Sequence, residues 1–301
     1  MKFKNVIVIP PCNTYGDCLS TIGMLYFLFK YYDNVYLDVS SNNDELNNYF
    51  KATFSNDNKI TLTNNVNNLL NSVSSEFHII NLNTGDWNSA KFHYFDNPNV
   101  NKDYYFNDSN PIYNRIDIEE IYKCFPNKHL PPEGMNINHL FYYELVGLNN
   151  NVRMDFFHHQ RNLSIEENLK REILSANGIS DGEKYNIIND PVGSQDILLS
   201  NIKNGYKTVN INFLSDTPGK LISLLEGAES IHFIEGSNVN FFYHCQYKNI
   251  FNYDGKIYLH VWLRNRNWSN YKLDYAYKMM TTPMLKNWNF IFSEDELKKI
   301  I

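Results

Sequence analysis

Short apolar segments of strand length alternate with helix-like segments in two separate stretches of this chain. In the first stretch, Val6 to Ile9 is a continuous apolar run of the kind expected for a strand buried on both faces. A loop containing Gly16 follows, and then residues 18–32 are apolar almost all round, as is typical of a helix packed against a sheet. The alternation predicts βαβ units and a parallel sheet.

The same alternation continues to residue 82 and restarts at residue 185. In the first stretch we expect further strands at 35–39, 60–62 and 77–82 and helices at 44–50 and 66–73. In the second we expect strands at 185–189, 208–213, 230–234 and 257–263 and helices at 196–202, 220–225 and 239–247. The tail, with a strand at 290–292 and a short helix capped by Ser293, is open to packing on either part of the chain.

Residues 84–132 interrupt the alternation. They are rich in Gly, Pro, Asn, Asp and aromatic residues, which indicates long loops with a short helix near 118–124. Two helices are then expected, at 137–146 and at 165–176. For the second, Ser164 is the expected N-cap, and Asn177-Gly178 provides a good end.

Two βαβ blocks around an irregular middle are typical of an α/β protein with two Rossmann-like domains that face one another across a cleft. The length of 301 residues also exceeds that of most single hydrophobic cores. We expect residues 1–160 to form the N-terminal domain and residues 161–301 to form a C-terminal domain that ends in a helix.

Composition excludes several classes of protein. The formal net charge of -6 gives no general attraction to phosphate backbones, which argues against a nucleic-acid-binding protein. No apolar stretch approaches the roughly 18 residues that a membrane helix needs. The four cysteines lack the spacing of a zinc cage or a disulfide framework. We therefore expect a cytoplasmic protein with no membrane span, no metal site and no bound cofactor.

The first strand-to-helix junction contains a carboxylate, Asp17, directly after Gly16. Glycine lets the backbone turn tightly, and the carboxyl edge of an open α/β sheet is the usual ligand site. Asp17 is open to two interpretations, a general base or the N-cap of the following helix. The junction lacks the GxGxxG pattern of dinucleotide-binding proteins, which makes an NAD-dependent oxidoreductase a poor match.

A second junction, at residues 234–238, closes one expected strand and opens a helix. Its glycine permits close approach of a ligand to the backbone, and the helix amides favour an anion. An ordinary Ser-capped helix is the alternative interpretation. Two other loops follow strands of the same block and contain small or capping residues. The candidate ligand-binding residues of the three loops are Asp190, Gly193, Ser194, Asp216, Thr217, Glu235, Gly236, Ser237 and Asn238.

Three arginines are candidate phosphate ligands, because a guanidinium group offers a bidentate fork: Arg153, Arg161 and Arg264. The adjacent His158 and His159 do not share a helix face and have no carboxylate or cysteine at ligand spacing, so a metal site is not expected there. For His244, on the helix after Ser237, we favour a core position. The GxSxG, P-loop and HExxH patterns do not occur, which disfavours several hydrolase and NTPase mechanisms.

Three segments give the chain a resemblance to GT-B glycosyltransferases. They are the opening strand with Gly16-Asp17, residues 141–148 leading into 152–157, and Ser215-Asp216-Thr217 to Glu235-Gly236-Ser237. The sequence is most similar in character to the heptosyltransferase-like proteins of bacteria, phages and giant viruses. Two features depart from them. A lysine-rich patch near the first loop is missing, and bulky residues 240–243 replace the usual small residues, so the resemblance leaves open whether the donor is ADP-heptose.

The resemblance implies an inverting, metal-independent transfer of a sugar from a nucleotide-sugar to a hydroxyl of a glycan or another acceptor. By position, Asp17 matches the carboxylate that these enzymes use as a base, in a domain that holds the acceptor. The junction at Glu235, Gly236 and Ser237 matches the segment that contacts the donor's nucleotide and phosphates. The alternative is a non-catalytic α/β protein that binds a nucleotide or a glycan.

Overall fold

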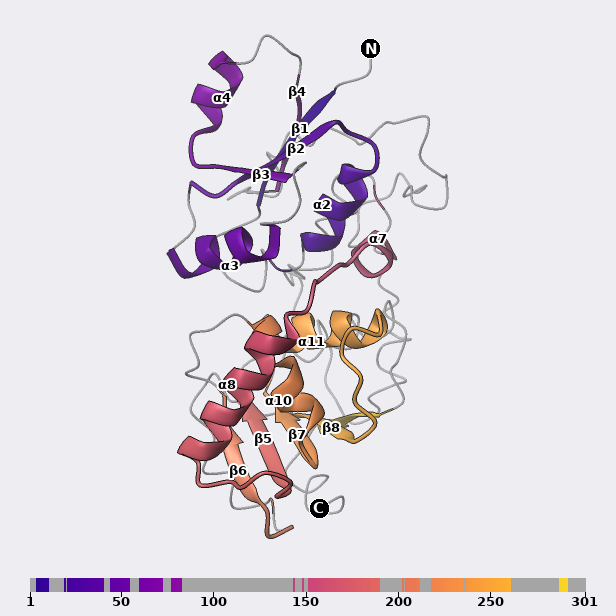
Figure 1. Cartoon of the computed structure of the whole chain (residues 1–301). Helices are drawn as coiled ribbons and strands as arrows, with labels where there is room; N and C mark the ends of the chain where they lie inside the picture. The colour runs from indigo at the N-terminus through magenta and orange to yellow at the C-terminus, as the bar shows by residue number, and fades with distance from the viewer. Residues whose placement is uncertain are drawn as a thin grey trace, which may run out of the picture. The chain divides into compact units, whose positions relative to one another are not determined.

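The computed structural model describes residues 4–10, 19, 21–40, 44–54, 60–72, 77–82, 143, 148, 151–189, 202, 204–211, 218–234, 237–260 and 287–291. The described residues up to His159 belong to one compact unit, and those from Gln160 onward belong to a second. Each unit has its own parallel sheet (Figure 1). The chain is therefore an α/β protein with two sheets, as expected. The cleft between two domains, and the roles assigned to each domain, stay predictions.

The first unit is built on a four-stranded sheet with the order β3-β2-β1-β4. All of its strand pairs are parallel. The strands are β1 (Asn5–Ile9), β2 (Asn34–Asp38), β3 (Ile60–Thr63) and β4 (Phe77–Asn81). The helices described in this unit are α2 (Ile22–Phe29), α3 (Asp44–Phe54), α4 (Val66–Ser72) and α7 (Asn151–Asp155).

Central strand β1 and helix α2 form the apolar centre of this unit. Val6, Ile7 and Val8 are fully buried, as predicted for a parallel strand covered on both faces. Helix α2 is buried nearly all round but shorter than the expected 18–32, since Thr21 holds its N-cap position. Gly23 lets α7 approach closely: a Cβ there would lie 2.8 Å from the Cα of Arg153.

The second unit has a five-stranded parallel sheet with the order β6-β5-β7-β8-β9. Its strands are β5 (Tyr185–Asn189), β6 (Lys207–Asn210), β7 (Ser230–Phe233), β8 (Lys256–His260) and β9 (Trp288–Ile291). Its described helices are α8 (Leu163–Ala176), the 3-10 helix η3 (Pro218–Leu221), α10 (Ile222–Glu226) and α11 (Ser237–Tyr247). The late strand expected in the tail is β9, which pairs with β8 and so completes the edge of this sheet.

Helices α10 and α11 pack on one face of the second sheet (Figure 1). The hydroxyl of Tyr185 on β5 donates to the carbonyl of Leu224 on α10, at 2.7 Å. The ring of Phe233 on β7 stacks on that of Phe242 on α11. His244 of α11 is buried, which confirms the core position favoured for it. The opposite face carries Asn186, Ser230, His232 and His260 and is also buried.

Helix α8 differs from its expected form at its start. The N-cap is Asn162 rather than Ser164: the side-chain oxygen of Asn162 accepts a hydrogen bond from the amide of Ile165, at 3.2 Å. The helix therefore begins at Leu163, two residues earlier than expected. Its end is as expected, with Asn177 at the C-cap and Gly178 at a φ of 66°. The helices expected at 118–124, 137–146 and 196–202 lie almost entirely outside the described residues.

Candidate functional site

The strand order of the second sheet reverses at β5. From β5 the chain moves to β6 on one side and then returns to β7 on the other side. In open α/β sheets, ligands bind at the carboxyl edge beside such a reversal, because the flanking connections diverge there and leave a crevice. The first sheet has the same feature at β1, which lies between β2 and β4. Each unit thus has one topological switch point among its described strands.

The ligand-binding residues expected from the sequence follow the three adjacent strands at this edge of the second sheet. Asp190, Gly193 and Ser194 follow β5, Asp216 and Thr217 follow β6, and Glu235 and Gly236 join β7 to α11. A hydrogen bond of 2.8 Å from the amide of Ile234 to the carbonyl of Asn189 holds the ends of β5 and β7 together. The topology therefore brings the three loops to one edge.

The side chains of most of these residues lie outside the described part of the chain. The backbone of Ser237 is described as the first residue of α11, and Asn238 is half-buried in its first turn. The expected strand-to-helix junction is therefore present, with β7 ending at Phe233 and α11 beginning at Ser237. The ligand contacts of the junction stay a prediction.

Asp17 also lies outside the described residues, in the connection that leaves β1 at the switch point of the first sheet. The N-cap position of α2 belongs to Thr21, and Leu19 before it is also helical, so the described residues test neither interpretation of Asp17. The hydroxyl of Tyr143 accepts a hydrogen bond of 3.0 Å from the amide of Met24 and satisfies one of the free amides at the start of α2. The general-base assignment of Asp17 stays a prediction.

Of the three candidate arginines, Arg153 lies in α7 and is buried in the first unit. Burial raises the pKa of the Tyr143 hydroxyl, and the positive charge of Arg153 opposes that shift in part. Arg153 is thus part of the packing around α2 and α7. Arg264 lies outside the described residues.

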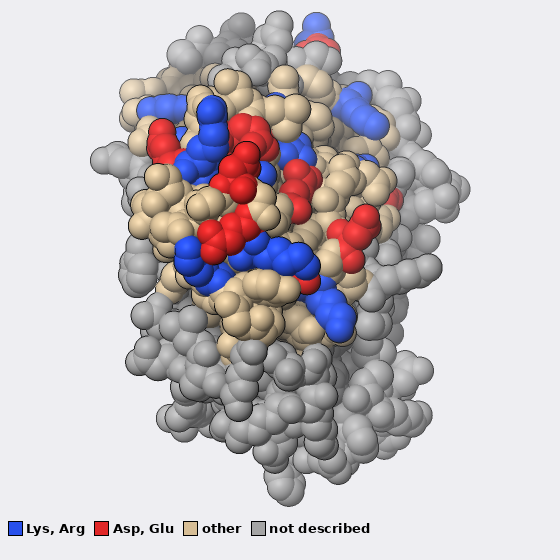
Figure 2. Space-filling model, turned by 60° about the horizontal axis from the view of Figure 1, so that its bottom comes forward, with Lys and Arg blue, Asp and Glu red and all other residues tan. Residues whose placement is uncertain are grey.

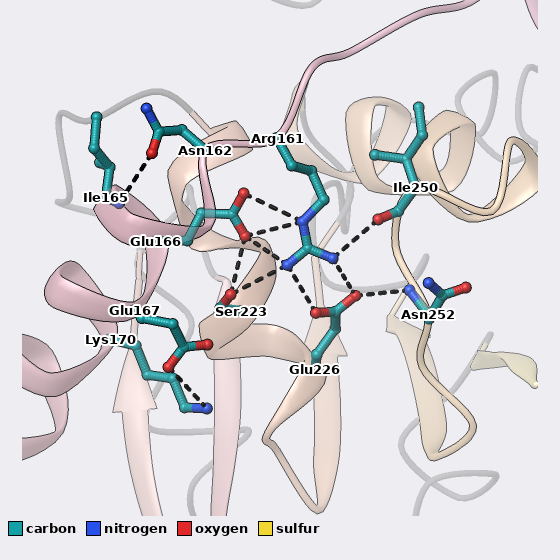
Figure 3. Close-up of polar contacts among 10 residues, drawn as sticks. All are labelled: Arg161, Asn162, Ile165, Glu166, Glu167, Lys170, Ser223, Glu226, Ile250 and Asn252. Atoms are coloured by element: carbon teal, nitrogen blue, oxygen red, sulfur yellow. Dashed lines mark hydrogen bonds and ion pairs between the residues drawn. The ribbon is translucent and has the colours of Figure 1, made fainter.

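Arg161 is the centre of a network of hydrogen bonds and ion pairs in the second unit (Figure 3). Its Nη2 lies 2.6 Å from Oε2 of Glu166, and its Nη1 lies 2.7 Å from Oε1 of Glu226. Nε donates to Glu166 as well, and Nη1 also donates to the carbonyl of Ile250 at 3.1 Å. Ser223 accepts from Nη2 and donates to Glu166.

All five N–H groups of a guanidinium have acceptors in this arrangement. Burial opposes the charge of Arg161, but hydrogen bonds and charge from Glu166 and Glu226 outweigh it and raise the pKa of the guanidinium. The network joins α8, α10 and the segment between α11 and β8. We therefore assign Arg161 a structural role rather than phosphate binding.

A chain of polar side chains crosses the buried face of the second sheet, and sequence reasoning did not identify it. The side-chain amides of Asn204 and Asn186 pair reciprocally at 2.9 Å. The Ser230 hydroxyl donates to Asn186 at 2.8 Å and lies 3.0 Å from Nε2 of His232. Nδ1 of His232 lies 3.1 Å from Nε2 of His260. Polar residues at alternate positions of otherwise apolar strands are the signal that could have revealed it.

His232 and His260 are both neutral. Burial lowers the pKa of His232 to about 3. Burial also lowers the pKa of His260 well below its usual range, with a further contribution from the neighbouring His232. Tyr258 stacks on His232 with ring centroids 4.8 Å apart. The face is therefore polar but uncharged.

Several charged side chains on the described surface of the second unit form ion pairs. Lys184 lies 2.8 Å from Glu229, and Lys207 lies 3.0 Å from Glu183. Figure 2 shows basic and acidic side chains side by side on one face of the molecule. Within the described parts of the chain, no three or more His, Cys, Asp or Glu side chains are grouped to hold a metal ion, and no helix has both the length and the apolar composition needed to cross a bilayer.

Comparison with known proteins does not assign the chain to a family. No protein-family model matches the chain, and no curated protein matches it. A solved structure, that of the glycosyl transferase family 9 from Veillonella parvula DSM 2008, aligns with 100% of this chain and 91% of its own, at 10% identity and a TM-score of 0.42. We therefore derive function from the residues of the chain itself.

Proposed function

We propose that the protein is a cytoplasmic glycosyltransferase of GT-B type that moves a sugar from a nucleotide-sugar to a hydroxyl of a glycan or another acceptor, with inversion and without a metal. One observation supports this most: the residues expected to bind the donor and to act as base follow strands at the topological switch points of the two sheets. A local sequence pattern and an independent feature of topology thus point to the same edges.

The second unit would bind the donor. The first amides of α11 have no partner within their own helix, and with the helix dipole they suit the diphosphate. Glu235, directly before them, would accept hydrogen bonds from the ribose hydroxyls. The small residues Gly193 and Ser194 after β5 would leave room for the ligand.

Asp17, in the first unit, would act as the general base. It would take the proton of the acceptor hydroxyl while that oxygen attacks the anomeric carbon, and the bond from this carbon to the diphosphate oxygen would break. A single displacement inverts the anomeric centre. The amides of α11, with Arg264 as the candidate side chain, would stabilise the charge that develops on the diphosphate. Arg161 would take no part, since its donors are engaged elsewhere.

A thermal-shift screen of the full chain against UDP, GDP, ADP, CMP and their sugars tests this function. We expect one nucleotide and its sugar to raise the melting temperature, because a ligand that binds the folded state stabilises it. A transfer assay with the selected nucleotide-sugar and a panel of acceptors should then release the free nucleotide. Binding without transfer or hydrolysis would instead identify a non-catalytic binding protein, and no stabilisation by any ligand of the panel would refute donor binding.

A further inference from the structure

The series of hydrogen-bonded side chains on the second sheet, from Asn204 to His260, has a defined direction of hydrogen bonding. Ser230 donates to Asn186, so its oxygen is free to accept from Nε2–H of His232. A neutral imidazole carries one N–H, so Nδ1 of His232 is then an acceptor, and it receives Nε2–H of His260. This order leaves a lone pair on Nδ1 of His260. The tautomers of both histidines therefore follow from the hydroxyl of Ser230.

Nδ1 of His260 has no hydrogen-bond partner among the described residues, although the side chain is fully buried. A buried acceptor without a partner costs free energy, so such atoms usually mark a bound water or a functional group. The other three ring nitrogens of the pair all have partners. Nδ1 of His260, the last atom of this hydrogen-bonded series, is thus the only ring nitrogen of the two histidines without a partner among the described residues.

That end lies at the carboxyl edge of the sheet. Leu259 pairs with Phe233, so His260 is level with Ile234, the first residue of the junction at 234–238. Strand β8 is the neighbour of β7 on the side away from β5. His260 therefore ends its strand next to the junction expected to hold the donor.

We propose that Nδ1 of His260 is a ligand-binding atom that accepts a hydrogen bond from an uncharged O–H or N–H group in the nucleoside part of the donor. This proposal rests on the proposed function. A lone pair attracts a hydrogen-bond donor and offers nothing to a phosphate oxygen, which itself only accepts. The diphosphate then belongs at the amides of α11, and the ribose hydroxyls or the amino group of the base belong at His260.

The hydrogen-bonded chain orients this acceptor in advance. Each member from Asn204 to His232 fixes the next, so the imidazole of His260 keeps both its tautomer and its ring orientation without a ligand. A site built to receive a donor group discriminates strongly against analogues that lack it, because the buried acceptor would stay unpaired. His260 would therefore contribute to the choice of nucleoside.

Two substitutions of one residue separate the two ring nitrogens. His260→Gln can keep a donor for His232 near the position of Nε2 while removing the acceptor at Nδ1. His260→Asn can keep an acceptor near Nδ1 while losing the contact with His232. His158→Gln, at an exposed histidine of the first unit, is the matched control. Affinities of the full-length variants for UDP, GDP, ADP and CMP are measured by calorimetry, with pyrophosphate as the probe for phosphate binding alone.

We expect His260→Gln to bind the preferred nucleotide about 10-fold more weakly and pyrophosphate as the wild type does, with His260→Asn weakened less. Saturation of the wild type with that nucleotide should also shift the ¹⁵N resonance of Nδ1 of His260. Equal nucleotide affinity in folded His260→Gln, or an unmoved resonance, would overturn the proposal and indicate a water at Nδ1. If His260→Gln does not fold, the ¹⁵N resonance of Nδ1 of His260 in the wild type tests the proposal by itself. A wild type that binds no nucleotide would refute the proposed function and this inference together.

Discussion

Nδ1 of His232 and Nε2 of His260 lie 3.1 Å apart on a fully buried face of the second sheet. One nitrogen of such a pair must donate and the other accept, so the contact requires at least one neutral ring. Two imidazolium ions at this distance would repel each other strongly and would have no counter-ion in the chain of neutral groups around them. The folded state therefore favours the neutral pair.

The free energy of unfolding should fall as the pH drops from about 6.5 towards 3. Burial lowers the pKa of His232 to about 3 in the folded state, and the unfolded value is about 6.5. Within this window the unfolded chain binds a proton that the folded chain does not, at a cost of up to about 1.4 kcal/mol per pH unit. Above about pH 6.5 the stability contributed by neutral His232 is fully present.

Urea titrations at about pH 7 and about pH 5 would measure this slope. His232→Gln removes the titrating ring, so the variant should lose less stability between the two values than the wild type does. Carboxyl groups that titrate in the same pH range change the stability of both proteins equally, so their effect cancels when the two losses are compared. An identical loss in both proteins would show that His232 is not held neutral.

Removal of Arg161 should destabilise the second unit strongly. Arg161→Ala leaves Glu166, whose side chain is only 1% exposed, with a buried and unpaired charge. The expected loss is about 3 kcal/mol. Lys184→Ala is the control, because Lys184 and its partner Glu229 are 57% and 40% exposed, and exposed pairs contribute about 1 kcal/mol or less. A similar small effect for both variants in urea unfolding would contradict the role of the network.

The N-cap of α8 gives a prediction with a control in the same turn. Asn162→Ala removes the acceptor for the amide of Ile165 and should cost about 1 kcal/mol. Ser164→Ala lies inside the helix, where alanine is the better helix former, and should be neutral or slightly stabilising. Thermal melts of both variants test this. A larger loss for Ser164→Ala would restore Ser164 as the cap.

Gly23→Ala should destabilise the first unit by about 1 to 3 kcal/mol. In an exposed helix the same substitution stabilises by up to about 1 kcal/mol, so the expected sign is reversed. The reason is that the new Cβ would meet the backbone of Arg153, which cannot move aside as a side chain can. An unchanged or higher melting temperature would show that α2 and α7 do not pack this closely.

Asp17→Asn should reduce turnover by about 10² to 10⁴-fold, with donor affinity nearly unchanged. Asparagine keeps the shape of the side chain but accepts no proton, and folding should survive. Initial rates at saturating nucleotide-sugar measure the effect. Near-normal turnover on the true substrates would remove Asp17 from the mechanism and leave Asp190 and Glu235 as the next carboxylates to test.

Local pattern predicted most of the regular elements that the structure describes, but it did not predict helix α7. Strand β5 lies at Tyr185–Asn189 as expected, and α11 ends at Tyr247 as expected but begins at Ser237, two residues before the expected 239. A strand buried on both faces must be apolar along its length, and that requirement is visible in sequence. The predicted start of α8 was wrong: Asn162 and Ser164 are both good cap residues, and it is Asn162 that accepts the hydrogen bond from the amide of Ile165.

The sequence by itself determined which segments become strands and which junctions carry glycine, serine and carboxylates, because hydrophobic periodicity and turn chemistry act over a few residues. The tertiary structure decided which strands became neighbours. It placed β5 between β6 and β7, brought Arg161 to Glu226 across 65 residues, and set His232 beside His260 across 28. Contacts between residues so far apart depend on how whole strands and helices pack, and no local pattern specifies that.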